Sequence, residues 1–356
     1  MKIIRLSTFL DYGGIESKMV KLSSHEDFDN EWVFMALGKG GKAADAIARN
    51  GKRVVCLNLD HRIPAFTTIW GLSRSLKNEK PDVLHTSGAE ANFFGFIAGK
   101  IAGIPKIIVE EIGIATQSRI GRLIFKYIFR NSSIAVGESK IVLNNIKEKY
   151  GLTNDRVKVI YNFGTFDYDF RGLTANKKNN FFQIIMVSRL EPVKNITGVL
   201  HVMAKLVHVD HIHINLVILG SGSLEVDLRN EVKSLDIEDY VDFKGLVEDP
   251  YPYLLQSDLY ILNSFSEGFS NALLEAMYCK VPSLSTNVGV APEIINDGVN
   301  GFIVPADDTD ALYERLRKVV TLPKEELLEV GLSGYECVVS MFSLDKHIKE
   351  LMEIYI

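Results

Sequence analysis

Two carboxylates eight residues apart frame the run Ser266-Glu267-Gly268-Phe269-Ser270-Asn271-Ala272-Leu273-Leu274-Glu275. Ser270 or Asn271 can cap a helix that begins there, because either side chain accepts hydrogen bonds from free backbone amides. These amides and the positive end of the helix dipole attract phosphate. Glu275, about one turn inside the helix, can accept hydrogen bonds from a pair of sugar hydroxyls. The alternative is an ordinary strand-to-helix loop, but the combination makes nucleotide-sugar chemistry the leading hypothesis.

Two cations, Arg189 and Lys194, lie on a second loop of this kind, in the run Ser188-Arg189-Leu190-Glu191-Pro192-Val193-Lys194-Asn195. Asn195 can cap the helix that follows. A diphosphate leaving group needs its developing charge met by cations that are already in place. The alternative is a solvated loop with two surface charges. Together with the Glu267–Glu275 segment, the loop favours a diphosphate-binding site.

Two pairs of glycines also follow expected strands. Gly220 and Gly222 allow close approach of a ligand to the backbone, although a tight turn explains Gly-Ser-Gly equally well. Gly13 and Gly14 offer bare amides to a phosphate. Neither spacing is the Gly-x-Gly-x-x-Gly dinucleotide fingerprint, which counts against a dehydrogenase.

His85 and the pair Glu110-Glu111 end two further strands. For His85, a substrate contact and a structural role are both open. Adjacent side chains alternate between the two faces of a strand, so at most one of the glutamates points into a ligand site. A pair of surface charges is an equally good interpretation of Glu110-Glu111.

The elements that must position these residues alternate between strand and helix. In the first half, short β-branched runs predict strands at 3–7, 32–36, 53–58, 83–85, 107–110, 133–136 and 157–160. Helical patterns lie near 15–24, 42–50, 66–78, 90–102, 119–130 and 139–149. Such alternation predicts a doubly wound parallel sheet, in which ligands bind at the carboxyl ends of the strands.

The alternation restarts after a polar stretch. Strands are expected at 183–187, 215–219, 241–244, 259–262, 281–285 and 301–304, and helices near 197–209, 224–235, 252–257, 270–278, 291–296 and 308–320. The expected domains are therefore 1–173 and 183–340, joined by a linker at 174–182. A C-terminal helix within 341–356 can pack back across the first domain.

Composition and charge limit the class of protein. The 356 residues are 47% apolar, enough for two domains. No run approaches the roughly 18 apolar residues of a membrane span, the N-terminus does not resemble a secretory signal, and three scattered cysteines suggest neither disulfides nor zinc. A cytosolic location is expected. The first 178 residues hold 27 Lys+Arg against 18 Asp+Glu, and the remaining residues hold 13 Lys+Arg against 27 Asp+Glu. The basic first half therefore favours an anionic partner, of which nucleic acid is the less favoured kind.

These motifs together resemble the retaining glycosyltransferases of family 4 (group 1), which have the GT-B fold of two Rossmann-like doubly wound domains facing a central cleft. The resemblance rests on the Glu-x₇-Glu run Glu267–Glu275 and on several shorter matches. These are Arg189, Lys194-Asn195, Gly220-Ser221-Gly222, Phe243-Lys244-Gly245, Ser264, Glu293–Gly301 and Gly13-Gly14-Ile15-Glu16. They span nearly the whole chain, most strongly 184–305.

The resemblance implies a role for each site residue. Glu275 would hold the ribose hydroxyls, Arg189 and Lys194 would neutralise the diphosphate, and Glu267 with the backbone at 268–270 would contact the hexose and the β-phosphate. The predicted donor-binding residues are Gly13, Gly14, Gly220, Gly268, Phe269, Ser270, Asn271 and Glu275, and the catalytic ones Arg189, Lys194, Glu267 and His85. The C-terminal domain would hold the donor and the N-terminal domain the acceptor, with no metal or other cofactor. Relatives often carry a histidine where Ile112 stands, so either Glu111 or His85 takes part of its role or acceptor handling differs.

A basic stripe is expected on the helix 119–130. Arg119, Arg122, Lys126 and Arg130 fall within about an 80° arc, flanked by apolar and aromatic residues. This pattern suits an anionic membrane surface or a lipid-linked acceptor, and one solvated helix face is the alternative. A peripheral position on the inner face of the cell membrane is then expected.

The leading hypothesis is a retaining glycosyltransferase that moves a hexose-type sugar from a nucleotide diphosphate sugar, preferably a UDP-sugar, to a saccharide or polyprenyl-linked saccharide acceptor in surface polysaccharide biosynthesis. A nucleotide-sugar epimerase or hydrolase with two similar domains is the first alternative. A binding module without catalytic activity is the second.

Overall fold

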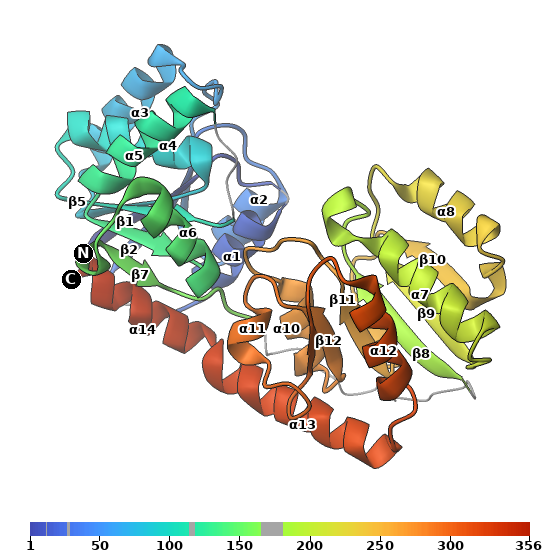
Figure 1. The fold of residues 1–356 in the computed structure, drawn as a ribbon. Coiled ribbons are helices and arrows are strands. Elements are labelled where there is room, and N and C mark those ends of the chain that lie inside the picture. The colour runs from blue at the N-terminus through green and yellow to red at the C-terminus, as the bar shows by residue number, and fades with distance from the viewer. Residues whose placement is uncertain (12, 27–28, 114–117, 165–180) are drawn as a thin grey trace. The chain divides into compact units, whose positions relative to one another are not determined.

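The computed structural model describes residues 1–11, 13–26, 29–113, 118–164 and 181–356. The chain divides into two compact units. Unit 1 comprises Met1–Phe163 and Leu344–Ile356, and unit 2 comprises Gly164–Ser343. The linker expected at 174–182 lies outside the described residues except for Phe181 and Phe182. Each unit is a parallel sheet with helices packed on it (Figure 1).

Unit 1 contains a seven-stranded sheet in the order β3-β2-β1-β4-β5-β6-β7. Its strands are β1 (Lys2–Ser7), β2 (Glu31–Ala36), β3 (Arg53–Cys56), β4 (Val83–Ser87), β5 (Lys106–Glu111), β6 (Ile134–Gly137) and β7 (Val157–Val159). Its helices are α1 (Gly14–Ser23), α2 (Lys42–Arg49), α3 (Phe66–Glu79), α4 (Ala89–Ala102), α5 (Arg119–Asn131), α6 (Lys140–Tyr150) and α14 (Leu344–Tyr355). The strand order reverses between β1 and β4, the kind of position at which open α/β sheets bind ligands. All seven predicted strands are confirmed.

Both faces of this sheet are covered, which explains its continuous apolar strands. Ile4 and Leu6 of β1 belong to a core formed with α3, α4, α5 and α6. Ile3 belongs to a second core, on the other face, with Met19 of α1 and Leu351 of α14. The C-terminal helix therefore completes unit 1, although the whole of unit 2 separates it from β7 in the sequence (Figure 1).

Unit 2 contains a six-stranded sheet in the order β10-β9-β8-β11-β12-β13. Its strands are β8 (Phe182–Val187), β9 (Ile214–Leu219), β10 (Val241–Gly245), β11 (Leu259–Leu262), β12 (Ser283–Thr286) and β13 (Phe302–Val304). Its helices are α7 (Ile196–His208), α8 (Glu225–Ser234), α9 (Tyr251–Leu254), α10 (Asn271–Tyr278), α11 (Ala291–Ile294), α12 (Thr309–Val319) and α13 (Lys324–Met341). Every element here except α13 was expected, and the strand expected from Val281 begins two residues later.

The helical run Lys324–Tyr355, which contains α13 and α14, is long and apolar enough to cross a membrane by length and composition alone. Buried core helices pass the same test. Leu327 and Val330 of α13 pack in the core of unit 2, and Leu351 and Ile354 of α14 pack in that of unit 1. Packing within the two units thus accounts for part of the apolar residues of this run, whereas Leu328 and Leu332 of α13 are exposed.

Candidate active site in unit 2

The loop after β8 is shaped by a short 3₁₀ turn and an asparagine. The turn Pro192–Lys194 leads into Asn195, whose φ of 46° is left-handed, a conformation that Asn adopts more readily than most residues. The Asn195 side chain accepts a hydrogen bond from the N–H of Gly198 at 3.3 Å and so caps α7, as predicted. This geometry fixes Lys194 immediately before the helix.

Lys194 and Glu267, predicted separately from two loops, meet in the structure. Lys194 Nζ lies 2.5 Å from Glu267 Oε1, and the Ser264 hydroxyl donates to the same oxygen at 2.7 Å. The Lys194 and Glu267 side chains are 15% and 11% exposed. The ion pair is therefore shielded from most solvent screening, but part of each side chain still reaches the surface. The backbone N–H of Phe265 donates to Val193 O at 2.8 Å and ties the loops together.

The turn after Glu267 opens α10 as the sequence predicts. Ser270 is the cap residue, and its hydroxyl accepts from the N–H of Leu273 at 3.3 Å. Asn271 is the first helical residue, and Glu275 lies one turn further, half-buried. The Phe269 ring packs edge-on against Phe342, with 5.7 Å between centroids, so it anchors the turn within unit 2. Its backbone, rather than its ring, remains the predicted ligand contact.

Gly289 belongs to the same site but was not predicted from the sequence. A Cβ atom on Gly289 would lie 2.8 Å from Glu267 Cβ and 3.3 Å from Gly268 O, and the residue has φ of +56°. Only glycine combines this left-handed conformation with so close an approach. The available signal was a glycine shortly before Pro292-Glu293 in the loop that follows β12.

The glycines after β9 have a structural task. A side chain at Gly220 or Gly222 would overlap the backbone of Ser188 or Leu190, so these glycines let the turn pack directly on the loop after β8. Glu191 joins the same two loops, since its carboxylate accepts from the N–H of Ser223 at 3.1 Å and from the Ser223 hydroxyl at 2.8 Å. Close packing between loops accounts for Gly220, and donor contact there stays a prediction.

Arg189 is the second predicted cation of this loop. Its side chain is exposed, and no carboxylate of the described residues lies within ion-pair distance of its guanidinium. It therefore differs from Lys194, whose charge is already balanced by Glu267. The hydrogen bonds from Ser223 lower the pKa of Glu191, and the charge of Arg189 adds to that effect. In the described part of the chain the Arg189 guanidinium makes no ion pair, so it is available to an anionic ligand.

In unit 1, Gly13 and Gly14 begin α1. Gly13 has φ of +155°, and the carboxylate of Glu16 lies where a Gly13 side chain would be. A carboxylate thus occupies the space over the turn in which a phosphate was expected. Contact of these glycines with the donor stays a prediction.

His85 lies at the centre of a buried charged cluster in unit 1. Its Nδ1 accepts hydrogen bonds from Arg5 at 2.8 Å and from the Tyr355 hydroxyl at 2.7 Å. The Arg5 guanidinium and Lys18 lie 3.0 Å and 2.5 Å from the two oxygens of Glu110. Burial and the Arg5 charge lower the pKa of His85 to about 3, so the ring is neutral. His85 is fully buried and hydrogen-bonded to Arg5 and Tyr355, which favours its structural role over the predicted substrate contact.

Glu110 of this cluster differs from its neighbour Glu111. Burial alone would raise the pKa of Glu110, but Lys18, His85 and Arg5 outweigh that effect and hold it well below the usual range. Glu110 is therefore a buried, fully paired carboxylate rather than a surface charge. The sequence contained no signal that Arg5 lies beside it, because 105 residues separate the two.

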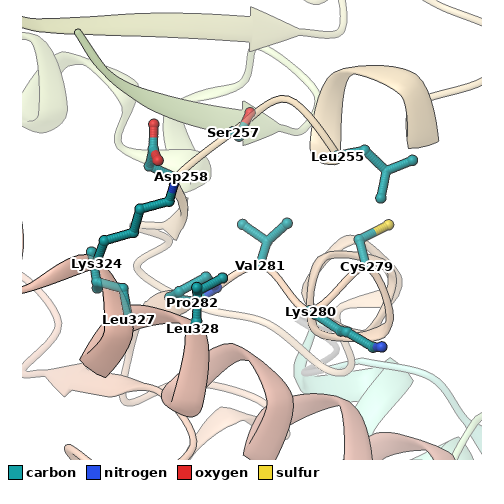
Figure 2. A pocket seen from close by; sticks show the side chains of 10 residues that line it. All are labelled: Leu255, Ser257, Asp258, Cys279, Lys280, Val281, Pro282, Lys324, Leu327 and Leu328. Carbon is teal, nitrogen blue, oxygen red and sulfur yellow. The ribbon is translucent and has the colours of Figure 1, made fainter. Parts of the chain in front are cut away.

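One pocket of about 580 Å³ lies away from the predicted residues. It adjoins the amino ends of β11 and β12, at the sheet edge opposite Glu267, between Asp258, Pro282 and Leu327 (Figure 2). Asp258 there accepts from the backbone N–H of Gln183 at 2.9 Å and so serves the fold. In the described part of the chain, no three His, Cys, Asp or Glu side chains gather closely enough to hold a metal ion.

Two family models match the chain. The model of glycosyl transferases group 1 matches residues 172–330, and that of Glycosyltransferase Family 4 matches residues 23–163. The chain belongs to glycosyltransferase family 4.

This family 4 glycosyltransferase is 29% identical over 240 residues to N-acetyl-alpha-D-glucosaminyl L-malate synthase of Bacillus anthracis, a match that covers 65% of the chain and 61% of that protein. It is 25% identical over 325 residues to UDP-Gal:alpha-D-GlcNAc-diphosphoundecaprenol alpha-1,3-galactosyltransferase of Escherichia coli, covering 85% and 82%. The structure of Anabaena HepE in complex with UDP superposes with a TM-score of 0.84 over 99% of both chains at 17% identity. That similarity establishes the GT-B fold of the glycosyltransferase.

Proposed function

We propose that this glycosyltransferase moves a hexose-type sugar, with retention of anomeric configuration, from a nucleotide diphosphate sugar to a saccharide or lipid-linked saccharide acceptor. A UDP-sugar is the favoured donor, and surface polysaccharide biosynthesis is the setting. The Escherichia coli relative supports the donor and the lipid-linked acceptor, because its name gives UDP-galactose as donor and a diphosphoundecaprenol-linked sugar as acceptor.

The observation that carries the proposal is the contact of Lys194 with Glu267 beside the capped start of α10. Lys194, Arg189 and the positive amino end of the α10 dipole supply the positive charge that a leaving diphosphate requires. In this proposal Glu267 lies next to the phosphates and contacts the transferred hexose. Glu275, one turn along α10, binds the ribose hydroxyls.

A panel of nucleotides and nucleotide sugars tests this proposal. We expect UDP to raise the melting temperature of the protein more than GDP or ADP at the same concentration, since a ligand at about 100 times its Kd stabilises by about 2.7 kcal/mol. NMR of the product should show the anomeric configuration of the donor. Release of free or epimerised sugar with no dependence on acceptor would instead identify a hydrolase or an epimerase, and binding without turnover would identify a silent module.

We also propose that α5 docks this enzyme on an anionic membrane. Phe125, Ile128 and Phe129 of α5 are buried in unit 1. The helix carries two further faces, a basic one and an exposed apolar one. The basic face comprises Arg119, Arg122, Lys126 and Arg130, and the apolar one comprises Ile120 (72% exposed), Leu123 (70%), Ile124 (37%) and Tyr127 (64%). Neighbouring basic and apolar faces match the headgroups and the acyl boundary of a bilayer.

Arg122→Glu should weaken binding to liposomes rich in anionic lipid by about 30-fold, because it changes the charge by two units and each unit near the surface contributes about 1 kcal/mol. Co-sedimentation at low salt measures the partition. Lys233→Glu, the same charge change on an exposed residue of α8, is the matched control and should have little effect. Equal retention of wild type and Arg122→Glu, or no retention of wild type, would contradict membrane docking by α5.

A further inference from the structure

Two further carboxyls lie at the carboxyl edge of the unit 1 sheet. Glu111 is the last residue of β5, and Glu138 directly follows β6. The strands are neighbours, and Glu111 is in register with Gly137, the residue before Glu138, so both acids lie at the same end of adjacent strands. Their exposed fractions are 5% and 7%, whereas His85 is fully buried. This is the edge at which an open α/β sheet meets its ligands.

The contacts of Glu111 differ from those of Glu110. Glu110, one residue earlier, is bonded to Arg5, Lys18 and Ser87. The Glu111 carboxylate accepts from the backbone N–H of Ile112, but its Oε2 atom is buried and has no hydrogen-bond partner among the residues that the structure describes. A buried polar atom without a partner costs stability and calls for a functional explanation.

The charged surroundings of the two acids come from several elements. Lys149 of α6, Glu90 of α4 and Glu110 act on Glu111. Lys18 of α1, Glu110 and Glu111 act on Glu138. Burial raises the pKa of Glu111 to about 7, because the hydrogen bond from the Ile112 backbone and the charge of Lys149 offset only part of the desolvation. Burial likewise raises the pKa of Glu138 to about 8, because Lys18 offsets only part of it. At neutral pH each carboxyl can therefore donate or accept a hydrogen bond.

We propose that Glu111 and Glu138 form the acceptor subsite on unit 1 and bind hydroxyl groups of the saccharide that receives the sugar. This inference rests on the proposed function and assigns residues to the acceptor side, which the Lys194–Glu267 site leaves open. The unpartnered Glu111 oxygen is satisfied by an acceptor hydroxyl, and Glu138 holds a second hydroxyl of the same sugar.

The proposal predicts opposite effects on stability and on transfer. A carboxyl whose pKa is higher in the folded protein than in the unfolded chain binds more protons when folded, so stability falls as pH rises between the two values. For these acids that window runs from about 4.5 to about 7–8. Glu111→Gln and Glu138→Gln remove this loss, and the melting temperature at pH 8.5 should rise above that of wild type, with a smaller difference at pH 5.

The test combines melting temperatures with kinetics on wild type, Glu111→Gln, Glu138→Gln and the exposed control Glu148→Gln. The acceptor probe is farnesyl-diphosphate-linked N-acetylglucosamine, with UDP-sugars as donors and donor hydrolysis by water as the background reaction. We expect the acceptor KM to rise at least tenfold in both site variants, with UDP binding and donor hydrolysis unchanged.

An acceptor KM within twofold of wild type in both site variants would overturn the acceptor subsite while leaving the proposed function intact. A fall in melting temperature at both pH values, with transfer and hydrolysis lost in proportion, would show that the two acids serve only the fold. A wild-type protein that neither transfers nor hydrolyses any nucleotide sugar would overturn the proposed function itself.

Discussion

Lys194→Ala is expected to lower the rate of sugar transfer by about 10²–10³-fold, the usual loss when one preplaced charge-stabilising group is removed. Lys194 is the shielded cation of the site, and its Nζ lies 2.5 Å from Glu267. Without it the departing diphosphate faces the Glu267 carboxylate, which keeps its hydrogen bond from the Ser264 hydroxyl, and the exposed Arg189 and the start of α10 remain to oppose the negative charge. The fall should appear mainly in kcat, because the charge develops in the transition state.

The measurement is the initial rate of transfer, with circular dichroism to check the fold. Lys194→Arg keeps the charge and should retain more activity than Lys194→Ala. Lys233→Ala removes an exposed lysine of the same unit and serves as the control. A wild-type kcat in Lys194→Ala would remove Lys194 from the catalytic set.

Arg5→Met should lower the free energy of unfolding of unit 1 by about 3–5 kcal/mol, the cost of removing one partner from a buried ion pair. Arg5 is fully buried and hydrogen-bonded to His85, Ser87, Glu110 and Tyr355. Methionine fills a similar volume but leaves Lys18 as the one ammonium or guanidinium partner of Glu110 among the described residues. Desolvation of the remaining carboxylate then opposes folding.

Urea unfolding followed by tryptophan fluorescence reports this loss selectively. The chain has two tryptophans, Trp32 in β2 and Trp70 in α3, and both belong to unit 1. Arg53→Met removes an ion pair with Glu79 in which the arginine is half-exposed, and this change should cost at most about 1 kcal/mol. Adding Glu110→Gln to Arg5→Met should restore part of the stability. A loss below about 1 kcal/mol in Arg5→Met would contradict a stabilising charge cluster.

Local patterns in the sequence predicted the strands and the loops that follow them. Apolar β-branched runs identified β1 and β8, because strands of a covered parallel sheet are buried on both faces. The site loops could be found because their chemistry is local: Asn195 and Ser270 both cap helices within three residues. Side-chain contacts between loops required the structure, as Lys194 and Glu267 lie 73 residues apart.

Helix α13 shows why other features could not be predicted. Gly331 and Gly334 lower its intrinsic helix propensity. In the structure they let the helix approach backbone atoms of Lys280 and Asn300, where a side chain would collide or crowd. Tertiary packing therefore overrides propensity there. The same limit hid Gly289 and Arg5, whose surroundings come from distant parts of the chain.

The placement of α14 has a consequence for synthesis. A ribosome makes all of unit 2, about 180 residues, before it makes this helix. Synthesis of unit 2 takes about 10–40 s at typical elongation rates. During that time the face of the unit 1 sheet that carries Ile3 lacks Leu351, and Arg5 lacks the hydroxyl of Tyr355. Collapse of a short chain needs far less time. The nascent protein therefore presents an uncovered apolar surface to chaperones until the segment beyond unit 2 emerges.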